Sequence, residues 1–172
     1  MNVESLVSEF KRIALELEKR FPSVDVAEHV GLILAINKLG LKPSEKQVQK
    51  GFDALNPKTD EKYEIKTRRR TKLKVETGQQ VKITTVTKNQ MKTLDYLVLV
   101  QLGYEYNVEA ACLVPKDVLR RYIEERGIKE GVRGEIRLNC FPLREKLYSY
   151  PGVKSLKPVS YTHLTLPTNR EV

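Results

Sequence analysis

The order of apolar and polar residues predicts two helices at the start of the chain. The apolar positions within residues 3–19 are spaced as on one face of a helix, with charged residues between them: Leu6, Phe10, Ile13, Ala14 and Leu17. A second helix is expected over residues 25–39, with Asp25 as its N-cap and Glu28 as the partner in a capping box. Gly40 is expected to end this helix, because glycine adopts the left-handed conformation that closes many helices.

Residues 50–67 have the pattern of a β-hairpin. Two runs suited to strands, 51–55 and 63–66, flank a turn at 56–60 that contains Asn, Pro and Asp. Apolar residues at helical spacing also occur within 44–55, so a helix there is the alternative interpretation. The glycine within that stretch and the Asn-Pro turn that follows it argue against a helix.

The register of the hairpin decides which of its side chains meet. With the turn centred between Lys58 and Thr59, Asp53 lies opposite Glu64, and side chains alternate between the two faces of each strand. One face is then apolar and consists of Phe52, Ala54, Tyr63 and Ile65. The other face is polar and consists of Asp53, Glu64 and Lys66.

The rest of the chain completes a mixed sheet with helices around it. The nearly continuous apolar run at 96–102 is typical of a central strand that is buried on both faces. The other expected elements are a strand at 80–87 with Val81, Ile83 and Thr85 on one face, a short helix at 88–94, a strand at 106–114, a helix at 116–126 ended by Gly127, a strand at 135–139 and a short helix at 143–148. The predicted fold class is α/β, with a mixed central sheet flanked by helices.

Length and composition fit one domain over residues 1–158. Forty per cent of the 172 residues are hydrophobic, which is enough to form a core. The longest apolar run, 30–36, is far shorter than the roughly 20 residues that a membrane span needs. The first residues lack the basic and then apolar pattern of a secretory signal, so we expect a cytoplasmic protein that does not bind membranes.

Cysteine and histidine are too scarce for several classes of site. Cys112 and Cys140 lack the close spacing of a zinc-binding motif, and we expect them to be reduced and mostly buried. His29 and His163 are the two histidines of the chain. A serine or cysteine nucleophile activated by histidine is therefore poorly supported, and so is a metal site built from several histidines.

The end of the chain differs in character from the rest. Residues 159–168 read VSYTHLTLPT, which resembles the translated read-through of a sequencing-library adapter. We therefore set residues 159–172 apart from the domain as a non-native tail. A natural strand-like tail rich in Thr and Leu is the alternative interpretation.

The opposed carboxylates of Asp53 and Glu64 are the strongest indication of chemistry. The Cβ atoms of opposed residues lie about 4.5–5.5 Å apart, and like charges at that distance repel. A divalent cation would remove this repulsion, and Mg²⁺ prefers oxygen ligands while it retains waters that a substrate phosphate can replace. Lys66 would lie beside the metal and could stabilise charge on a phosphate or orient the attacking water. The alternative is an ordinary solvated hairpin face on which Lys66 bridges one of the carboxylates.

The motif around these residues resembles that of a known nuclease superfamily. Gly51-Phe52-Asp53-Ala54, followed after ten intervening residues by Glu64-Ile65-Lys66, is similar to the PD-(D/E)xK motif of nucleases with the restriction-endonuclease-like fold. The expected order of helix, hairpin, strand, helix and strand over roughly residues 24–114 is similar as well. Lys50–Ala54 and Glu64–Lys66 also resemble a group of small domains of this fold with KG(F/Y)DA followed by (E/Q)IK. Phe52 departs from the superfamily motif, which usually has proline before the aspartate.

This resemblance implies a reaction and assigns roles to its residues. Asp53 and Glu64, joined by the carbonyl of Ile65, would bind Mg²⁺ or Mn²⁺, and Lys66 would be the catalytic lysine. The implied reaction is metal-dependent hydrolysis of a DNA phosphodiester bond by in-line attack of water. A homodimer would suit a double-strand break, with one site for each strand.

Two further residues are candidates because of their positions in the predicted elements. Glu28 lies on the first core helix, where many members of the superfamily have an acidic residue. Gln90 lies on the helix after the third strand, where some members have a polar active-site residue. The alternatives are a capping role for Glu28 and an ordinary exposed helix position for Gln90.

Positive charge is concentrated directly after the motif. Residues 66–92 contain nine lysines and arginines and one acid, Glu76, and account for almost all of the net charge of +9. Beside a carboxylate pair, such a stretch suits the phosphate backbone of DNA, with contacts that weaken with salt and read no sequence. The candidate contacts, several of them in a polar loop at 69–78, are Arg68, Arg69, Arg70, Lys72, Lys74, Lys82 and Lys88. The alternatives are an inactive nucleic-acid-binding module of the same fold and a protein-interaction domain with a basic loop.

Overall fold

The computed structural model describes residues 3–20, 26–44, 51–70, 84–138 and 147–156 of the chain. Its helices are α1 (Val3–Arg20), α2 (Ala27–Leu39), α5 (Lys88–Thr93) and α6 (Lys116–Glu125). Its strands are β1 (Lys42–Pro43), β2 (Ala54–Leu55), β3 (Lys62–Arg69), β4 (Thr84–Thr87), β5 (Tyr96–Leu102), β6 (Val108–Pro115), β7 (Glu135–Leu138) and β8 (Lys154–Ser155). These elements confirm the α/β class that the sequence predicts.

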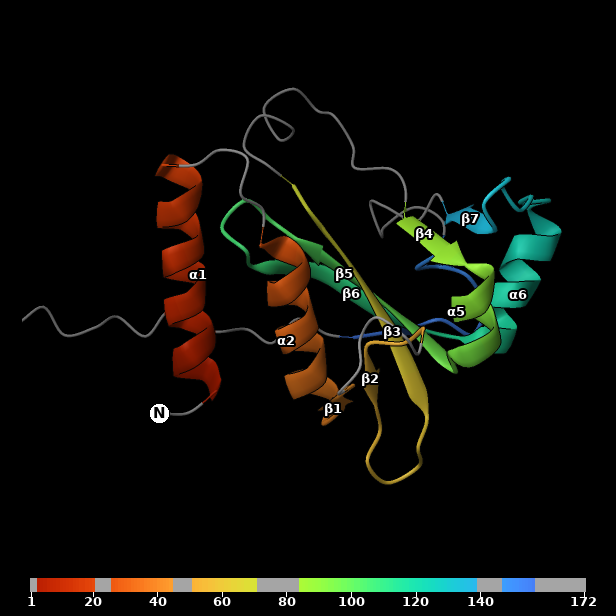
Figure 1. Ribbon diagram of the computed structural model, residues 1–172, viewed down its shortest axis with the longest axis horizontal. Coiled ribbons are helices and arrows are strands. Elements are labelled where there is room, and N and C mark those ends of the chain that lie inside the picture. Colours follow the sequence, from red (N-terminus) through yellow and green to blue (C-terminus); the bar gives the residue numbers. More distant parts are fainter. Residues whose placement is uncertain (1–2, 21–25, 45–50, 71–83, 139–146, 157–172) are drawn as a thin grey trace, which may run out of the picture.

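A mixed six-stranded sheet forms the centre of the fold, with the strand order β1-β2-β3-β5-β6-β8 (Figure 1). β3 and β5 run parallel, and the chain between them includes β4 and α5. The other neighbouring strands of this sheet are antiparallel, and β4 pairs with β7 in a separate two-stranded sheet. Figure 1 shows α1 and α2 on one side of the large sheet and α5, α6 and the small sheet on the other.

The strand β5 explains how the fold has two apolar cores. Val98, Val100 and Leu102 pack with residues of α1 and α2. Leu97 and Leu99 point to the other face and pack with residues of α5 and α6. Because successive side chains of a strand alternate between its faces, a strand that is apolar at nearly every position joins both cores. The prediction of a central buried strand at 96–102 is therefore confirmed.

The hairpin has the predicted register. Ala54 pairs with Tyr63 and Leu55 pairs with Lys62. The turn is closed by two backbone hydrogen bonds, from Asn56 N to Glu61 O and from Asp60 N to Asn56 O, both 2.9 Å. β2 has only two residues, whereas β3 has eight, so that within the described residues β3 extends beyond its hairpin partner. The described part of the alternative helix at 44–55 is not helical.

The first turn of α2 differs from the prediction. Val26 is the N-cap, and its side chain makes no capping hydrogen bond. Glu28 is therefore the second residue of the helix, and a capping box needs its acidic partner at the third. The predicted capping box of Asp25 and Glu28 is wrong for this reason. The end of the helix is as predicted, since Gly40 has a φ of 64° and its N–H bonds to Ile36 O.

Other expectations are confirmed with shifted bounds. The strand expected at 80–87 is described from residue 84 as β4, but its buried face is formed by Thr84 and Val86, not by the face predicted to contain Thr85. β6 and α6 lie within one or two residues of their predicted positions, and β7 is described up to residue 138. β1 and β8 were not predicted. Most of the helix expected at 143–148 lies outside the described residues, and its described end, 147–148, forms a turn instead of a helix. The tail 159–172, Val81, Ile83, Cys140 and His163 also lie outside the described residues.

Two findings bear on the expectations from composition. Cys112 is reduced and buried, and burial raises the pKa of its thiol to about 12. The helices that the structure describes include none of the length and apolar character needed to cross a bilayer.

Candidate functional site

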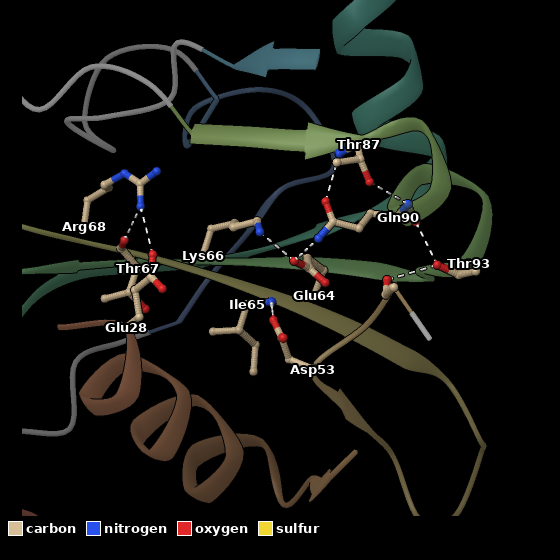
Figure 2. A network of polar contacts seen from close by, with 11 residues as sticks. Glu28, Asp53, Glu64, Ile65, Lys66, Thr67, Arg68, Thr87, Gln90 and Thr93 are labelled. Carbon is tan, nitrogen blue, oxygen red and sulfur yellow. Dashed lines mark hydrogen bonds and ion pairs between the residues drawn. The ribbon is translucent and has the colours of Figure 1, made fainter. Parts of the chain in front are cut away.

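The residues of the motif lie around a hollow at the edge of β3, beside the residue that directly precedes β2. Glu64 and Lys66 alternate with Ile65 along the strand, so that the two charged side chains share the face toward α5. α2 contributes the opposite wall (Figure 2). The lining residues are Glu28, His29, Leu32, Asp53, Glu64, Ile65 and Lys66.

Asp53 is joined to β3 by both its main chain and its side chain. Its N–H donates to Tyr63 O at 2.8 Å, and its Oδ2 accepts a hydrogen bond from Ile65 N at 2.7 Å. The carboxylate thus takes the place that a strand neighbour would have beside Ile65, and it lies at the edge of the sheet rather than on its face. Because the N–H and C=O of one strand residue point to the same edge, the Ile65 carbonyl also faces the Asp53 side.

Glu64 is held by two donors at one of its oxygens. Its side chain is almost fully buried, and Oε1 accepts hydrogen bonds from Lys66 Nζ at 2.6 Å and from Gln90 Nε2. Among the described residues, no donor reaches the second oxygen of Glu64 or of Asp53. The structure therefore brings Asp53, Glu64, Lys66 and Gln90 together, and these contacts use one oxygen of each carboxylate (Figure 2).

The orientation of the Gln90 amide is fixed by Thr87, a residue that the sequence analysis did not single out. Thr87 Oγ1 accepts from Gln90 N at 3.2 Å, and Thr87 N donates to Gln90 Oε1 at 2.8 Å. These two bonds form a capping box at the start of α5. Because Gln90 Oε1 accepts this hydrogen bond from Thr87, Gln90 Nε2 is the atom that points to Glu64. The Thr-x-x-Gln spacing was a signal that could have predicted this arrangement.

The surroundings disfavour the ionised form of both carboxylates. Burial raises the pKa of Glu64, and the charge of Asp53 adds to the shift while Lys66 and Gln90 oppose it. Burial also raises the pKa of Asp53, against the hydrogen bond from Ile65 N and the charge of Lys66, and the charge of Glu28 adds to the rise. A cation that binds between the two groups would favour their ionised forms, and its binding would release protons.

The raised pKa values predict how removal of one charge changes stability. A carboxyl group with a raised pKa in the folded state adds stability below its unfolded-state pKa, about 4, and that stability is lost as pH rises through the folded-state value. We therefore expect Glu64→Gln to match or exceed the wild-type free energy of unfolding at neutral pH in EDTA, with a difference that shrinks toward pH 4. Urea unfolding at several pH values measures this. Glu9→Gln, which changes an exposed carboxylate of α1, is the control. A less stable Glu64→Gln at neutral pH would mean that the ionic contact with Lys66 outweighs burial.

Glu28 and His29 lie at the α2 wall of the hollow, and the charge of Glu28 is near enough to act on Asp53. The Glu28 side chain is 82% exposed and lies 3.7 Å from an Arg68 nitrogen. His29 is exposed, as expected for a histidine on a helix surface. In the part of the chain that the structure describes, no group of three or more His, Cys, Asp and Glu side chains could hold a metal ion. A metal at Asp53 and Glu64 would therefore depend on carbonyl and water oxygens for its other ligands.

The structure separates the basic residues predicted to contact nucleic acid. Arg68 lies on the face of Lys66, and Arg70 follows two residues later with an ion pair to Glu109. Lys88 is exposed on α5 and lies 3.4 Å from Glu130. Lys72, Lys74 and Lys82 lie outside the described residues.

Arg69 has different surroundings from its neighbours. Its side chain is 1% exposed, pairs with Glu18 of α1 and stacks on the Tyr106 ring, with 4.2 Å from its guanidinium carbon to the ring centre. The sequence analysis placed Arg69 in a polar loop, but β3 continues through it, and the alternation of the strand turns it toward α1. We therefore leave Arg69 out of the proposed nucleic-acid surface.

We compared the sequence with family models and with curated proteins. No family model matches the chain, and a search of curated proteins gives no significant match.

Proposed function

We propose that this protein is a metal-dependent endonuclease that hydrolyses DNA phosphodiester bonds. The observation that carries the proposal is the convergence of Asp53, Glu64 and Lys66 on one hollow at the edge of β3. A buried carboxylate, Glu64, and a half-buried one, Asp53, beside a lysine that is itself held in place fit metal-assisted attack of water on a phosphate better than a solvated hairpin face.

The topology supports a restriction-endonuclease-like core within the observed α/β fold. α2 precedes the β2–β3 hairpin, and β4 and α5 lead to β5, which runs parallel to β3. This is the order of elements that the resemblance to the PD-(D/E)xK superfamily implies. The carboxylates lie at the hairpin strands, where that superfamily has them.

The donor set suits Mg²⁺ or Mn²⁺. Both ions prefer carboxylate, carbonyl and water oxygens, and Asp53, Glu64 and the Ile65 carbonyl would supply the first two kinds. When bound, such an ion polarises the phosphate and lowers the pKa of a coordinated water. The raised pKa values of both carboxyl groups fit this use, because a cation would offset the burial and repulsion that raise them.

The chain itself contributes positioning and charge. Gln90 and Lys66 hold Oε1 of Glu64, which turns the carboxylate so that its other oxygen is left for the ion. Lys66 Nζ lies at the hollow, where its positive charge would stabilise the charge that develops on the phosphate. Arg68 lies on the same face of β3 and Arg70 follows directly after the strand, and both would hold the DNA backbone.

The test of the proposed function is a plasmid assay with the full chain. We expect supercoiled DNA to be nicked in Mg²⁺ or Mn²⁺ and to stay intact in EDTA. Salt-sensitive retardation of the plasmid without cleavage, unaffected by EDTA, would instead indicate an inactive nucleic-acid-binding module. Neither cleavage nor salt-sensitive binding would favour a protein-interaction domain.

A further inference from the structure

Arg68 is the next cation after Lys66 on the same face of β3. Its Nη1 donates to Thr67 O at 2.9 Å, which holds the guanidinium close to the strand. The same nitrogen lies 3.7 Å from Oε1 of Glu28, across the hollow on α2 (Figure 2). The Arg68 side chain is 29% exposed and that of Glu28 is 82% exposed, so water surrounds the carboxylate far more than the guanidinium.

The contact between Glu28 and Arg68 is weak by its geometry. A separation of 3.7 Å is too long for a hydrogen bond, and exposed ion pairs contribute little. A phosphate group binds a guanidinium through two parallel hydrogen bonds, which are stronger and better defined. A phosphate that reached Arg68 would therefore replace Glu28 as its anionic partner.

The position of Arg68 also indicates which phosphate it would meet. Side chains two residues apart on one face of a strand are separated by about 6.6 Å. Lys66 lies at the carboxylate pair, whereas the Arg68 guanidinium is held at Thr67 O and near Glu28, one such step further along β3. It suits the neighbouring phosphate of the same DNA strand.

We infer that Arg68 binds the DNA phosphate next to the scissile one, and that Glu28 occupies Arg68 until this phosphate displaces it. The inference rests on the proposed function and deepens it, because it names the contact and the competing carboxylate. It also gives Glu28 a role other than metal ligand. Glu28 acts as an anionic competitor that weakens binding of DNA, and its removal strengthens that binding.

The test measures binding of a labelled DNA duplex in Ca²⁺ and in EDTA. We expect Glu28→Gln to tighten binding about two- to fivefold and Arg68→Gln to weaken it by a similar factor. Glu9→Gln removes the same charge from an exposed ion pair on α1 and serves as the matched control for the change in net charge. In an Arg68→Gln background, Glu28→Gln should change the affinity no more than Glu9→Gln does, since its effect depends on Arg68.

The result can contradict this inference without contradicting the proposed nuclease. Unchanged or weaker binding by Glu28→Gln, or a gain that persists without Arg68, would overturn the competitor role. If the wild type nicked plasmid and Glu28→Gln needed a higher Mg²⁺ concentration for the same rate, the inference would be overturned in favour of a metal-binding role for Glu28. A gain in affinity that requires Arg68 would support it even if no plasmid were cleaved, and in that case only the nuclease proposal would fail.

Discussion

Replacement of Asp53 by Asn is expected to lower plasmid nicking in Mg²⁺ by about 10³-fold or more. Asn has nearly the same shape, and its Oδ1 can still accept the hydrogen bond from Ile65 N. The change therefore removes one negative charge and leaves the edge of β3 in place. A bound metal contributes several kcal/mol to stabilisation of the transition state, and each 1.36 kcal/mol corresponds to a tenfold change in rate. Initial rates of nicking over a range of Mg²⁺ concentrations measure the loss.

The control for this variant is Asp60→Asn. Asp60 lies in the turn of the same hairpin, is exposed and has a φ of 58°, a conformation that Asn also tolerates. We expect this variant to cleave at the wild-type rate. The folding of Asp53→Asn is checked by urea unfolding, where removal of a charge with a raised pKa should not lower the stability at neutral pH. A folded Asp53→Asn with wild-type activity would contradict the proposed metal site.

Replacement of Lys66 by Met is the second change with a large expected effect. The ammonium group lies 2.6 Å from Glu64 Oε1 and lines the hollow, so its loss removes a positive charge from the position where charge would develop on the phosphate. Loss of one such donor typically lowers kcat by about 10²–10³-fold. Affinity for DNA should fall only a few-fold, because Arg68 and Arg70 remain. Cleavage rates at saturating enzyme, compared with binding in Ca²⁺, separate the two effects.

Lys62→Met is the matched control for this change. Lys62 is the first residue of β3, is exposed and lies over the Phe52 ring. The substitution removes the same charge but should leave the cleavage rate unchanged. If Lys66→Met and Lys62→Met lowered cleavage equally, the effect would be one of net charge, and a catalytic role for Lys66 would be excluded. Lys66→Met should also be less stable by about 1.5–3 kcal/mol, since buried Glu64 loses a charged hydrogen-bond partner.

Sequence and structure agree best where local interactions decide the conformation. The register of the hairpin was predictable, because the Asn-Pro turn and the alternation of apolar residues allow one pairing that buries Ala54 and Tyr63. The central strand and the short helix that carries Gln90 were predictable for similar reasons. The first turn of α2 was not predictable, because capping depends on the residue at which the helix starts. With Val26 as the N-cap, Glu28 is one position too early to form a capping box.

By itself, the amino-acid sequence determined the hairpin, the central strand and most of the other elements, and it pointed to Asp53, Glu64 and Lys66 as the candidate site residues. Turn residues and periodicity act over a few positions, so they define the hairpin and its register without knowledge of the rest of the chain, whereas the predicted shared face of Asp53 and Glu64 was wrong, because the Asp53 carboxylate lies at the strand edge. Only the tertiary structure decided that the Asp53 carboxylate binds Ile65 N–H at the strand edge, that Gln90 holds Glu64, and that Arg69 is buried against α1. These contacts join residues far apart in the chain, or they depend on where β2 begins. They follow from the packing of helices and strands and not from the local sequence pattern.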